Sequence, residues 1–192
     1  MPIPPRRLTL ASASPRRLEL LRAGGWEVES APADIDESMR PGEEAAEYVR
    51  RLAQEKAARI AMARPPETVV LGADTAVVVE GEVLGKPGDE AEAAAMLARL
   101  AGREHAVLTG VCLRRGAVER IQVETTRVWF SPLTPAEIAA YAASGEPRGK
   151  AGGYAIQGRA ACFIPRIEGS YSNVVGLPLA VVWKMWKTLR LD

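Results

Sequence analysis

Residues 68–75 read TVVLGADT, an unbroken apolar run that ends in a glycine and a carboxylate. A short apolar run between turn signals is typical of a buried strand, and Pro65 and Pro66 end the helical pattern before it. A carboxylate at the end of such a strand lies where open α/β sheets present ligand-binding groups. The run therefore predicts an α/β fold with Asp74 at a functional edge of the sheet. The alternative is that Asp74 pairs structurally with an arginine.

Strand-like and helical patterns alternate along the rest of the chain. Pro15 opens one helical pattern and Gly24 closes it, whereas a second pattern runs from Glu43 to about Ala63. The expected strands span residues 7–11, 26–31, 68–71, 77–79, 83–84, 106–114, 118–130 and 160–164, and the expected helices span 15–23, 43–63, 89–100, 134–144 and a C-terminal segment around 181–189. No repeat or linker divides the sequence, so residues 1–192 are expected to form one domain or two closely packed lobes.

The composition argues against several classes of protein. Of the residues, 47% are apolar and 26% are charged, and the formal charge of +1 lacks the basic excess of a nucleic-acid binder. Cys112 and Cys162 lack the spacing of a zinc site and are expected to be buried thiols in a reducing compartment. The start lacks a signal-peptide core, and no run approaches the roughly 20 apolar residues of a membrane helix. We therefore expect a cytoplasmic protein that binds neither membrane nor nucleic acid.

The first turn of the chain is a candidate phosphate pocket. Residues 12–17 read SASPRR and place two hydroxyls and two guanidinium groups at the start of a helix. Free N–H groups and the helix dipole favour an anion there, so Ser12, Ser14 and Arg16 are candidate phosphate ligands. The alternative is that Ser14 only caps the helix and the arginines are solvated.

The chain has only five lysines among its 25 basic residues, and three of them fall in candidate site segments. A compact ammonium suits phosphate neutralisation, so Lys56, Lys86 and Lys150 are candidate phosphate ligands. Lys56 shares a helix face with apolar residues, and its alternative role is to extend from that face to solvent. The segment around Lys86 is not a P-loop, because a proline stands where the metal-binding hydroxyl belongs.

Two carboxylates are candidates for metal chemistry. Asp74 can hold a divalent metal or accept a proton from an attacking water, and Glu37 offers a second oxygen ligand. Glu37 lies in an acidic loop beside Asp36, which is the alternative ligand.

A glycine-rich loop, residues 145–158, is the candidate base-recognition segment. It is long and polar, and it carries Tyr154, which can stack on a base, and Gln157, whose amide can both donate and accept. The alternative is an ordinary connection with Tyr154 packed in the core. His105, the single histidine, is expected at the start of a strand and not in catalysis.

In their order along the chain, these motifs resemble the Maf family of nucleotide pyrophosphatases. The segments are LASASPRR at 10–17, GADT at 72–75, LGKP at 84–87, KAGGYAIQG at 150–158 and EGSYSNVVGLP at 168–178. The resemblance implies a central curved mixed sheet flanked by helices, two lobes with a cleft, and a likeness to inosine triphosphate pyrophosphatase. It also implies a divalent metal, Mg²⁺ or Mn²⁺, and a homodimer.

The resemblance further implies roles for individual residues. Asp74 matches the catalytic proton acceptor and, with Glu37, the metal site. Arg16, Thr75 and Gln157 match positions linked to substrate choice, in a pattern similar to the branch acting on dTTP and UTP. Together with the residue-based reasoning, we expect Asp74, Lys56, Lys86 and Glu37 to be catalytic, and Ser12, Ser14, Arg16, Thr75, Lys150 and Gln157 to bind substrate.

The expected activity is hydrolysis of dTTP and UTP to the monophosphate and pyrophosphate. Modified pyrimidine nucleotides, removed in a house-cleaning role, are a variant of the same reaction. A non-catalytic nucleotide-binding regulator of cell division or septum formation is the alternative from another class, because it could use the same pocket without turnover.

Overall fold

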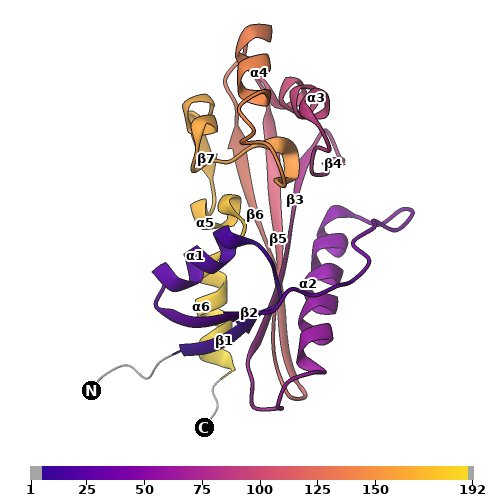
Figure 1. The fold of residues 1–192 in the computed structure, drawn as a ribbon, viewed down its shortest axis with the longest axis vertical. Helices are drawn as coiled ribbons and strands as arrows, with labels where there is room; N and C mark the ends of the chain where they lie inside the picture. The colour runs from indigo at the N-terminus through magenta and orange to yellow at the C-terminus, as the bar shows by residue number, and fades with distance from the viewer. Residues whose placement is uncertain (1–5, 190–192) are drawn as a thin grey trace. The chain divides into compact units, whose positions relative to one another are not determined.

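The computed structural model of the chain describes residues 6–189, and its elements are labelled in Figure 1. The strands are β1 (Arg6–Leu10), β2 (Trp26–Ser30), β3 (Val70–Val79), β4 (Glu82–Leu84), β5 (Glu104–Arg115), β6 (Val118–Trp129) and β7 (Arg166–Glu168). The helices are α1 (Pro15–Ala23), α2 (Ala45–Ala61), α3 (Glu90–Leu100), α4 (Pro135–Ala142), α5 (Tyr171–Val175) and α6 (Leu179–Thr188), with 3₁₀ turns η1 (Ala151–Gly153) and η2 (Arg159–Phe163).

The strands form one mixed sheet in the order β2-β1-β3-β5-β6-β7, with β4 paired to β3. β1 runs parallel to both β2 and β3, whereas β3 and β4 are antiparallel, as are β6 and β7. The predicted α/β fold with a central mixed sheet is therefore confirmed.

The chain divides into two compact units that share three strands. One unit holds the described residues up to Asp74, residues 109–124 and the described residues from Gly176 onward. The other holds residues 75–108 and 125–175. β3, β5 and β6 each contribute one end to each unit, so the candidate site residues fall into two sets that are described separately below.

In the first unit, the alternation of side chains along β3 decides what each face of the sheet contacts. Val70 lies in a cluster with apolar residues of α2, whereas Leu71 and Ala73 lie in a second cluster with residues of α1 and α6. Successive side chains on a strand point to opposite faces, so Gly72 and Asp74 share the α2 face with Val70. The two clusters give this unit helices on both faces.

Two glycines allow α2 to lie directly against the sheet. A Cβ atom on Gly72 would lie 2.0 Å from the carbonyl oxygen of Ala53, and one on Gly110 of β5 would lie 2.1 Å from that of Val49. Both contacts are far inside van der Waals distance, so the helix backbone occupies space that any side chain would fill. This close approach places the buried face of α2, which carries Lys56, on the strand that carries Asp74.

In the second unit, three rings form an edge-to-face cluster. His105 and Phe130 each contact Tyr154, with ring centroids 5.4 and 5.0 Å apart, and the Tyr154 hydroxyl lies 2.8 Å from His105 Nε2. At the start of α4, in the segment predicted as a helix, Thr134 and Glu137 form a capping box. Tyr154 is therefore a core residue, as the plainer interpretation of the glycine-rich loop expected, and His105 lies near the start of β5.

Three local predictions were wrong. β3 does not end at Asp74 but continues to Val79, because its β-branched second half pairs with β4 through Val77 and Leu84. Residues 160–164 do not form a strand, since most of them belong to the 3₁₀ turn η2. Cys162, on that turn, is exposed, whereas Cys112 is buried as expected. β7 and α5 were not predicted, being too short to give a periodic signal.

Among residues 6–189, no helix is both long and apolar enough to cross a membrane.

Candidate functional site

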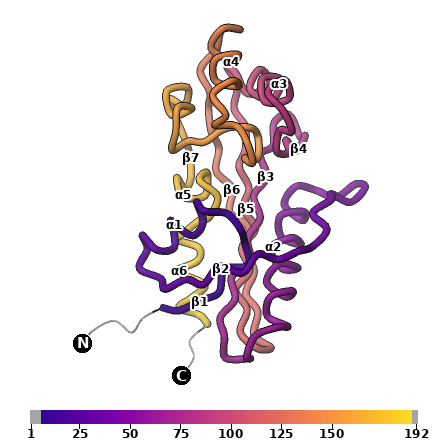
Figure 2. The backbone as a smooth tube through the Cα atoms, viewed as in Figure 1, coloured from indigo at the N-terminus to yellow at the C-terminus, as the bar shows by residue number. Residues whose placement is uncertain are grey.

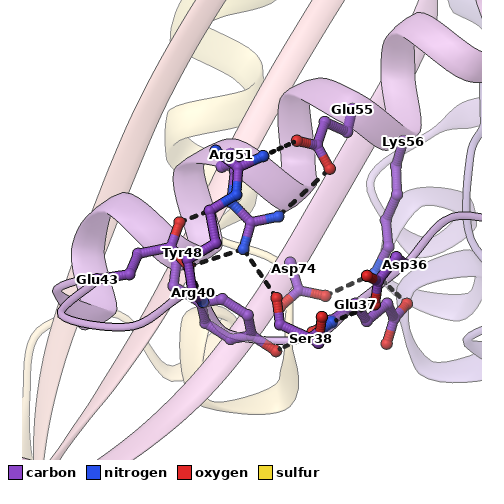
Figure 3. Close-up of polar contacts among 10 residues, drawn as sticks. All are labelled: Asp36, Glu37, Ser38, Arg40, Glu43, Tyr48, Arg51, Glu55, Lys56 and Asp74. Carbon is purple, nitrogen blue, oxygen red and sulfur yellow. Dashed lines mark hydrogen bonds and ion pairs between the residues drawn. The ribbon is translucent and has the colours of Figure 1, made fainter.

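A buried lysine joins two carboxylates in the first unit. Lys56 Nζ lies 2.6 Å from Asp74 Oδ1 and 2.6 Å from Glu37 Oε1. Figure 3 shows the three side chains converging from α2, β3 and the loop before α2. The side chains of Lys56 and Asp74 are only 7% and 11% exposed, whereas that of Glu37 is 42% exposed. The arrangement is an ion-pair cluster with one side open to solvent.

The cluster explains how the chain tolerates two buried charges. An isolated ammonium or carboxylate in this position would carry a large desolvation cost, and breaking such a pair typically costs about 3–5 kcal/mol. Lys56 therefore does not extend to solvent, as its alternative role proposed, and Asp74 pairs with this lysine. The charge of the buried Arg17 also interacts with Asp74. The partners reach each other because Asp74 and Lys56 lie on facing surfaces of β3 and α2.

The acidic loop assigns different contacts to its neighbouring carboxylates. Glu37 reaches Lys56, whereas Asp36 accepts a hydrogen bond from the backbone N–H of Ser38 at 2.9 Å. That backbone hydrogen bond is the main reason why the pKa of Asp36 lies below its usual value. Of the two candidates, Glu37 is thus the one whose carboxylate lies at the Asp74 centre.

The turn between β1 and α1 is organised around the Ser12 hydroxyl. Ser12 Oγ accepts from the backbone N–H of Ser14 at 3.2 Å and from Nη1 of Arg17 at 3.1 Å. Ser14 Oγ in turn accepts from the N–H of Arg17 and caps α1. Ser14 therefore caps α1 and leaves the turn structured at the positive end of the helix dipole, whereas the solvated arginines expected by the same alternative are contradicted by the burial of Arg17.

The two arginines of this turn differ in burial, and sequence reasoning selected only one. Arg16 is half-buried, whereas Arg17 is buried and donates from Nε to the carbonyl oxygen of Gly176 at 2.9 Å. Burial lowers the pKa of both, and for Arg17 the charges of Asp74 and Glu37 partly oppose that effect. Both arginines stood in the same motif, but which one turns inward depends on the rotation of α1.

In the second unit, the segments of Lys86 and Lys150 lie together. The N–H of Gly152 donates to the carbonyl oxygen of Gly85 at 2.9 Å, and the Cβ position of Gly153 is 3.6 Å from Pro87. Lys86 is exposed, whereas Lys150 donates from Nζ to the carbonyl oxygen of Glu146. The backbone therefore brings together two predicted phosphate ligands that are distant in sequence.

The candidate recognition residues have different exposures. Thr75 is half-buried in β3, and Gln157 is exposed in the glycine-rich loop. The loop is held by Glu146, whose carboxylate accepts from the hydroxyl of Tyr141 at 2.8 Å and from the N–H of Arg159 at 3.0 Å. Glu146 was not predicted, because its role depends on backbone N–H groups that no sequence motif specifies.

The carboxylates of the first unit fit a hard divalent cation that is also bound by ligands from outside the protein. Glu37 and Asp74 both contact Lys56 Nζ, so their carboxylates are neighbours. Mg²⁺ in nucleotide sites is commonly bound by one or two carboxylates together with phosphate oxygens and water. Within residues 6–189, no group of three or more histidine, cysteine, aspartate or glutamate side chains could hold a metal. A cation here would need ligands from a phosphorylated molecule or from water.

The fold and the site together define an α/β protein with a carboxylate–ammonium centre on its sheet and a structured serine–arginine turn at a helix N-terminus. The family model described as Maf-like protein matches residues 7–189. The chain therefore belongs to the Maf family.

Proteins of several organisms are similar to this chain over most of its length. A protein of Anaeromyxobacter sp. (strain Fw109-5) is 56% identical, covering 91% of this chain and 85% of its own, and one of Hahella chejuensis is 56% identical, covering 91% and 88%. Both are named dTTP/UTP pyrophosphatase. Among solved structures, the Staphylococcus aureus Ham1 protein is 16% identical with a TM-score of 0.46, covering 65% of this chain and 72% of its own.

Proposed function

We propose that this protein is a nucleoside triphosphate pyrophosphatase that hydrolyses dTTP and UTP to the monophosphate and pyrophosphate. The observation that carries the proposal is the Asp74–Lys56–Glu37 cluster, in which a carboxylate on a rigid strand is held beside a buried ammonium. Relatives named dTTP/UTP pyrophosphatase at 56% identity support the reaction and the substrates.

In the proposed reaction, water attacks the α phosphorus of the triphosphate. A bond forms between the water oxygen and this phosphorus, the bond from the α phosphorus to the bridging oxygen breaks, and pyrophosphate leaves. Asp74 accepts the proton of the attacking water through Oδ2, since its Oδ1 atom binds Lys56. Lys56, Lys86 and Arg16 stabilise the charge that spreads over the phosphates in the transition state.

We propose that Glu37 and Asp74 hold a divalent cation, Mg²⁺ or Mn²⁺, together with oxygens of the bound triphosphate. When bound, such a cation would neutralise phosphate charge and polarise the reacting phosphoryl group. Activity is expected to disappear with EDTA and to return with either metal, whereas full activity in EDTA would contradict this assignment.

Substrate choice is proposed to depend on Gln157 and Thr75. A side-chain amide can pair with both the N–H and the carbonyl of a uracil or thymine ring, and Gln157 is exposed and able to do so. Gln157→Glu keeps the shape but removes the donor, and should lower kcat/KM for dTTP by about tenfold relative to GTP. An unchanged dTTP-to-GTP ratio would contradict this role.

The test of the function is release of monophosphate and pyrophosphate from dTTP, UTP, CTP, GTP and methylated nucleotides with Mg²⁺ or Mn²⁺. Turnover of dTTP and UTP by the wild type, absent in Asp74→Asn, is expected. Binding without turnover across the panel would favour the non-catalytic regulator, which the names of the relatives do not favour. A modified pyrimidine nucleotide turned over faster than dTTP would favour the house-cleaning role.

Two further expectations accompany this function. A homodimer is proposed, and sedimentation of the wild type at the mass of one 20.6 kDa chain would contradict it. A cytoplasmic location is also proposed, in keeping with a nucleotide substrate, and fractionation of cells would test it.

A further inference from the structure

The acidic loop that carries Glu37 has no helix or strand of its own between residues 31 and 44. Figure 2 shows this connection extending beyond the N-terminal end of α2 before it turns back into the helix. An exposed segment of this length loses much conformational entropy when it is ordered, so defined contacts must hold Glu37 beside Lys56.

Two side chains of α2 bind the backbone of this loop at Glu37 and at the next residue. The hydroxyl of Tyr48 donates to the carbonyl oxygen of Glu37 at 2.9 Å, and Nη2 of Arg51 donates to that of Ser38 at 3.0 Å. Tyr48 and Arg51 are three residues apart and therefore share one face of the helix. Both are drawn in Figure 3 beside the loop residues Glu37 and Ser38.

The guanidinium of Arg51 is itself fixed by the end of the loop. Its Nε and Nη2 atoms bind the two carboxylate oxygens of Glu43 at 2.6 and 2.7 Å, and Glu43 also accepts from the backbone N–H of Arg40 at 3.0 Å. The side chains of Arg51 and Glu43 are only 13% and 9% exposed. Bidentate geometry and low exposure separate this pair from an ordinary surface salt bridge.

We infer that Arg51, supported by Glu43 and Tyr48, is a positioning residue that holds the Glu37 carboxylate at the Lys56–Asp74 centre. Arg51 contacts the loop backbone at Ser38, and it acts on the site only through Glu37. The inference rests on the proposed function, because it assigns Glu37 to the cation and the phosphates. Without Arg51, the loop keeps its sequence but loses the contact that fixes the backbone next to Glu37.

The first experiment compares Arg51→Met with Arg50→Met. Arg50 is the neighbouring residue of the same helix. Its side chain is half-exposed and makes a long contact of 3.7 Å with Glu47, so Arg50→Met controls for the loss of one charge. Arg51→Met should raise both the Kd for Mn²⁺, measured by calorimetry, and the KM for dTTP by about tenfold, as expected for a residue that orients a ligand. Arg50→Met should change neither by more than about twofold. Equal effects of the two variants would overturn the inference.

A double-mutant cycle tests whether Arg51 acts through Glu37. In a Glu37→Gln background, Arg51→Met should add less than about a twofold change in Mn²⁺ affinity, because the carboxylate it positions is already absent. Fully additive effects would overturn the inference, since they would mean that Arg51 acts independently of Glu37.

A measurement without catalysis separates failure of this inference from failure of the proposed function. Hydrogen exchange of the backbone amides of residues 34–42 should be at least about tenfold faster in Arg51→Met than in Arg50→Met. Tyr48→Phe removes only one hydroxyl and should increase the exchange rate by a smaller factor. It provides the same test if Arg51→Met does not fold. Unchanged exchange in both variants would overturn the inference even if the wild type hydrolyses dTTP, and faster exchange would support it even if dTTP is not the substrate.

Discussion

The two loops that carry candidate site residues are held in opposite ways. The acidic loop, residues 31–44, is held by cationic and hydroxyl donors of α2 that bind its carbonyl oxygens. The glycine-rich loop, residues 145–158, is held by the carboxylate of Glu146 and the hydroxyl of Tyr141, which accept from N–H groups in the loop and directly after it. The first loop presents a charge, whereas the second presents an amide. We propose that the first unit supplies the proton acceptor and the second unit supplies the base-recognition loop, and four changes test this division.

The largest effect is expected from Asp74→Asn, in the unit assigned to chemistry. Loss of the proton acceptor should lower kcat for dTTP by about 10³-fold or more. The variant should remain folded, because Glu37 still neutralises Lys56 and the asparagine oxygen can still accept from it. Steady-state kinetics and thermal unfolding measure the two quantities. Retained kcat would contradict the division, since the chemistry would then lie elsewhere.

Gly158→Ala disturbs the recognition loop without a change of charge. A Cβ atom on Gly158 would lie 2.3 Å from Glu146 Oε2, so the carboxylate must move away from the N–H groups it accepts from. The KM for dTTP should rise by about 10²-fold, because displacements near 1 Å have effects of this size, while kcat falls less. Gly85→Ala is the matched control, since nothing lies within 4 Å of its Cβ position. A fall in kcat alone would place Gly158 with the chemistry.

Acid should act on the recognition unit before it acts on the acidic loop. Burial lowers the pKa of His105 from 6.5 to about 4, so the folded state keeps the ring neutral while the unfolded state binds a proton. Its contribution to stability is full above pH 6.5 and is lost as the pH falls toward 4, which amounts to about 2 kcal/mol between pH 7 and pH 5. Urea unfolding at both pH values should show this loss in the wild type and a smaller loss in His105→Gln.

The acidic loop provides the contrast in the same experiment. The hydrogen bond from Arg51 holds the pKa of Glu43 at about 2, against an ordinary 4.5. Its contribution is full above pH 4.5 and is lost only as the pH falls toward 2, so the ion pair is intact at pH 5. Hydrogen exchange in residues 34–42, corrected for the intrinsic effect of pH, should thus be the same at pH 7 and pH 5. Faster exchange there at pH 5 would contradict the assignment.

The smallest effect on dTTP kinetics is expected from Tyr141→Phe. The hydroxyl donates to Glu146 and accepts from the N–H of Ala155 at 3.2 Å, so its removal leaves two half-buried polar groups without this partner. The free energy of unfolding should fall by about 1–3 kcal/mol, with a few-fold rise in the KM for dTTP and no change in kcat. Urea unfolding and kinetics would measure both. A larger loss of kcat than of affinity would again contradict the division.

Much of the fold could be predicted because periodicity records which face of each element is buried. The buried face of α2 was predicted from its spacing, with Lys56 included, and the capping box of Thr134 and Glu137 fixed the start of α4. Residues 160–164 were predicted wrongly, because a short apolar run is compatible with several backbone shapes. There the N–H groups of Arg159 and Ala160 bind the Glu146 carboxylate, a partner that the run itself does not reveal.

By itself, the sequence determined the family, the alternation of strands and helices, and most of the residue types at the candidate site, because these depend on local patterns and on motifs read in order. Only the tertiary structure decided which partners those residues meet. Lys56 contacts Asp74 because Gly72 and Gly110 let α2 approach the sheet, and Glu37, not Asp36, joins them because Arg51 and Tyr48 hold the loop backbone. Such pairings depend on the rotation and distance of elements far apart in the chain, which no local pattern encodes.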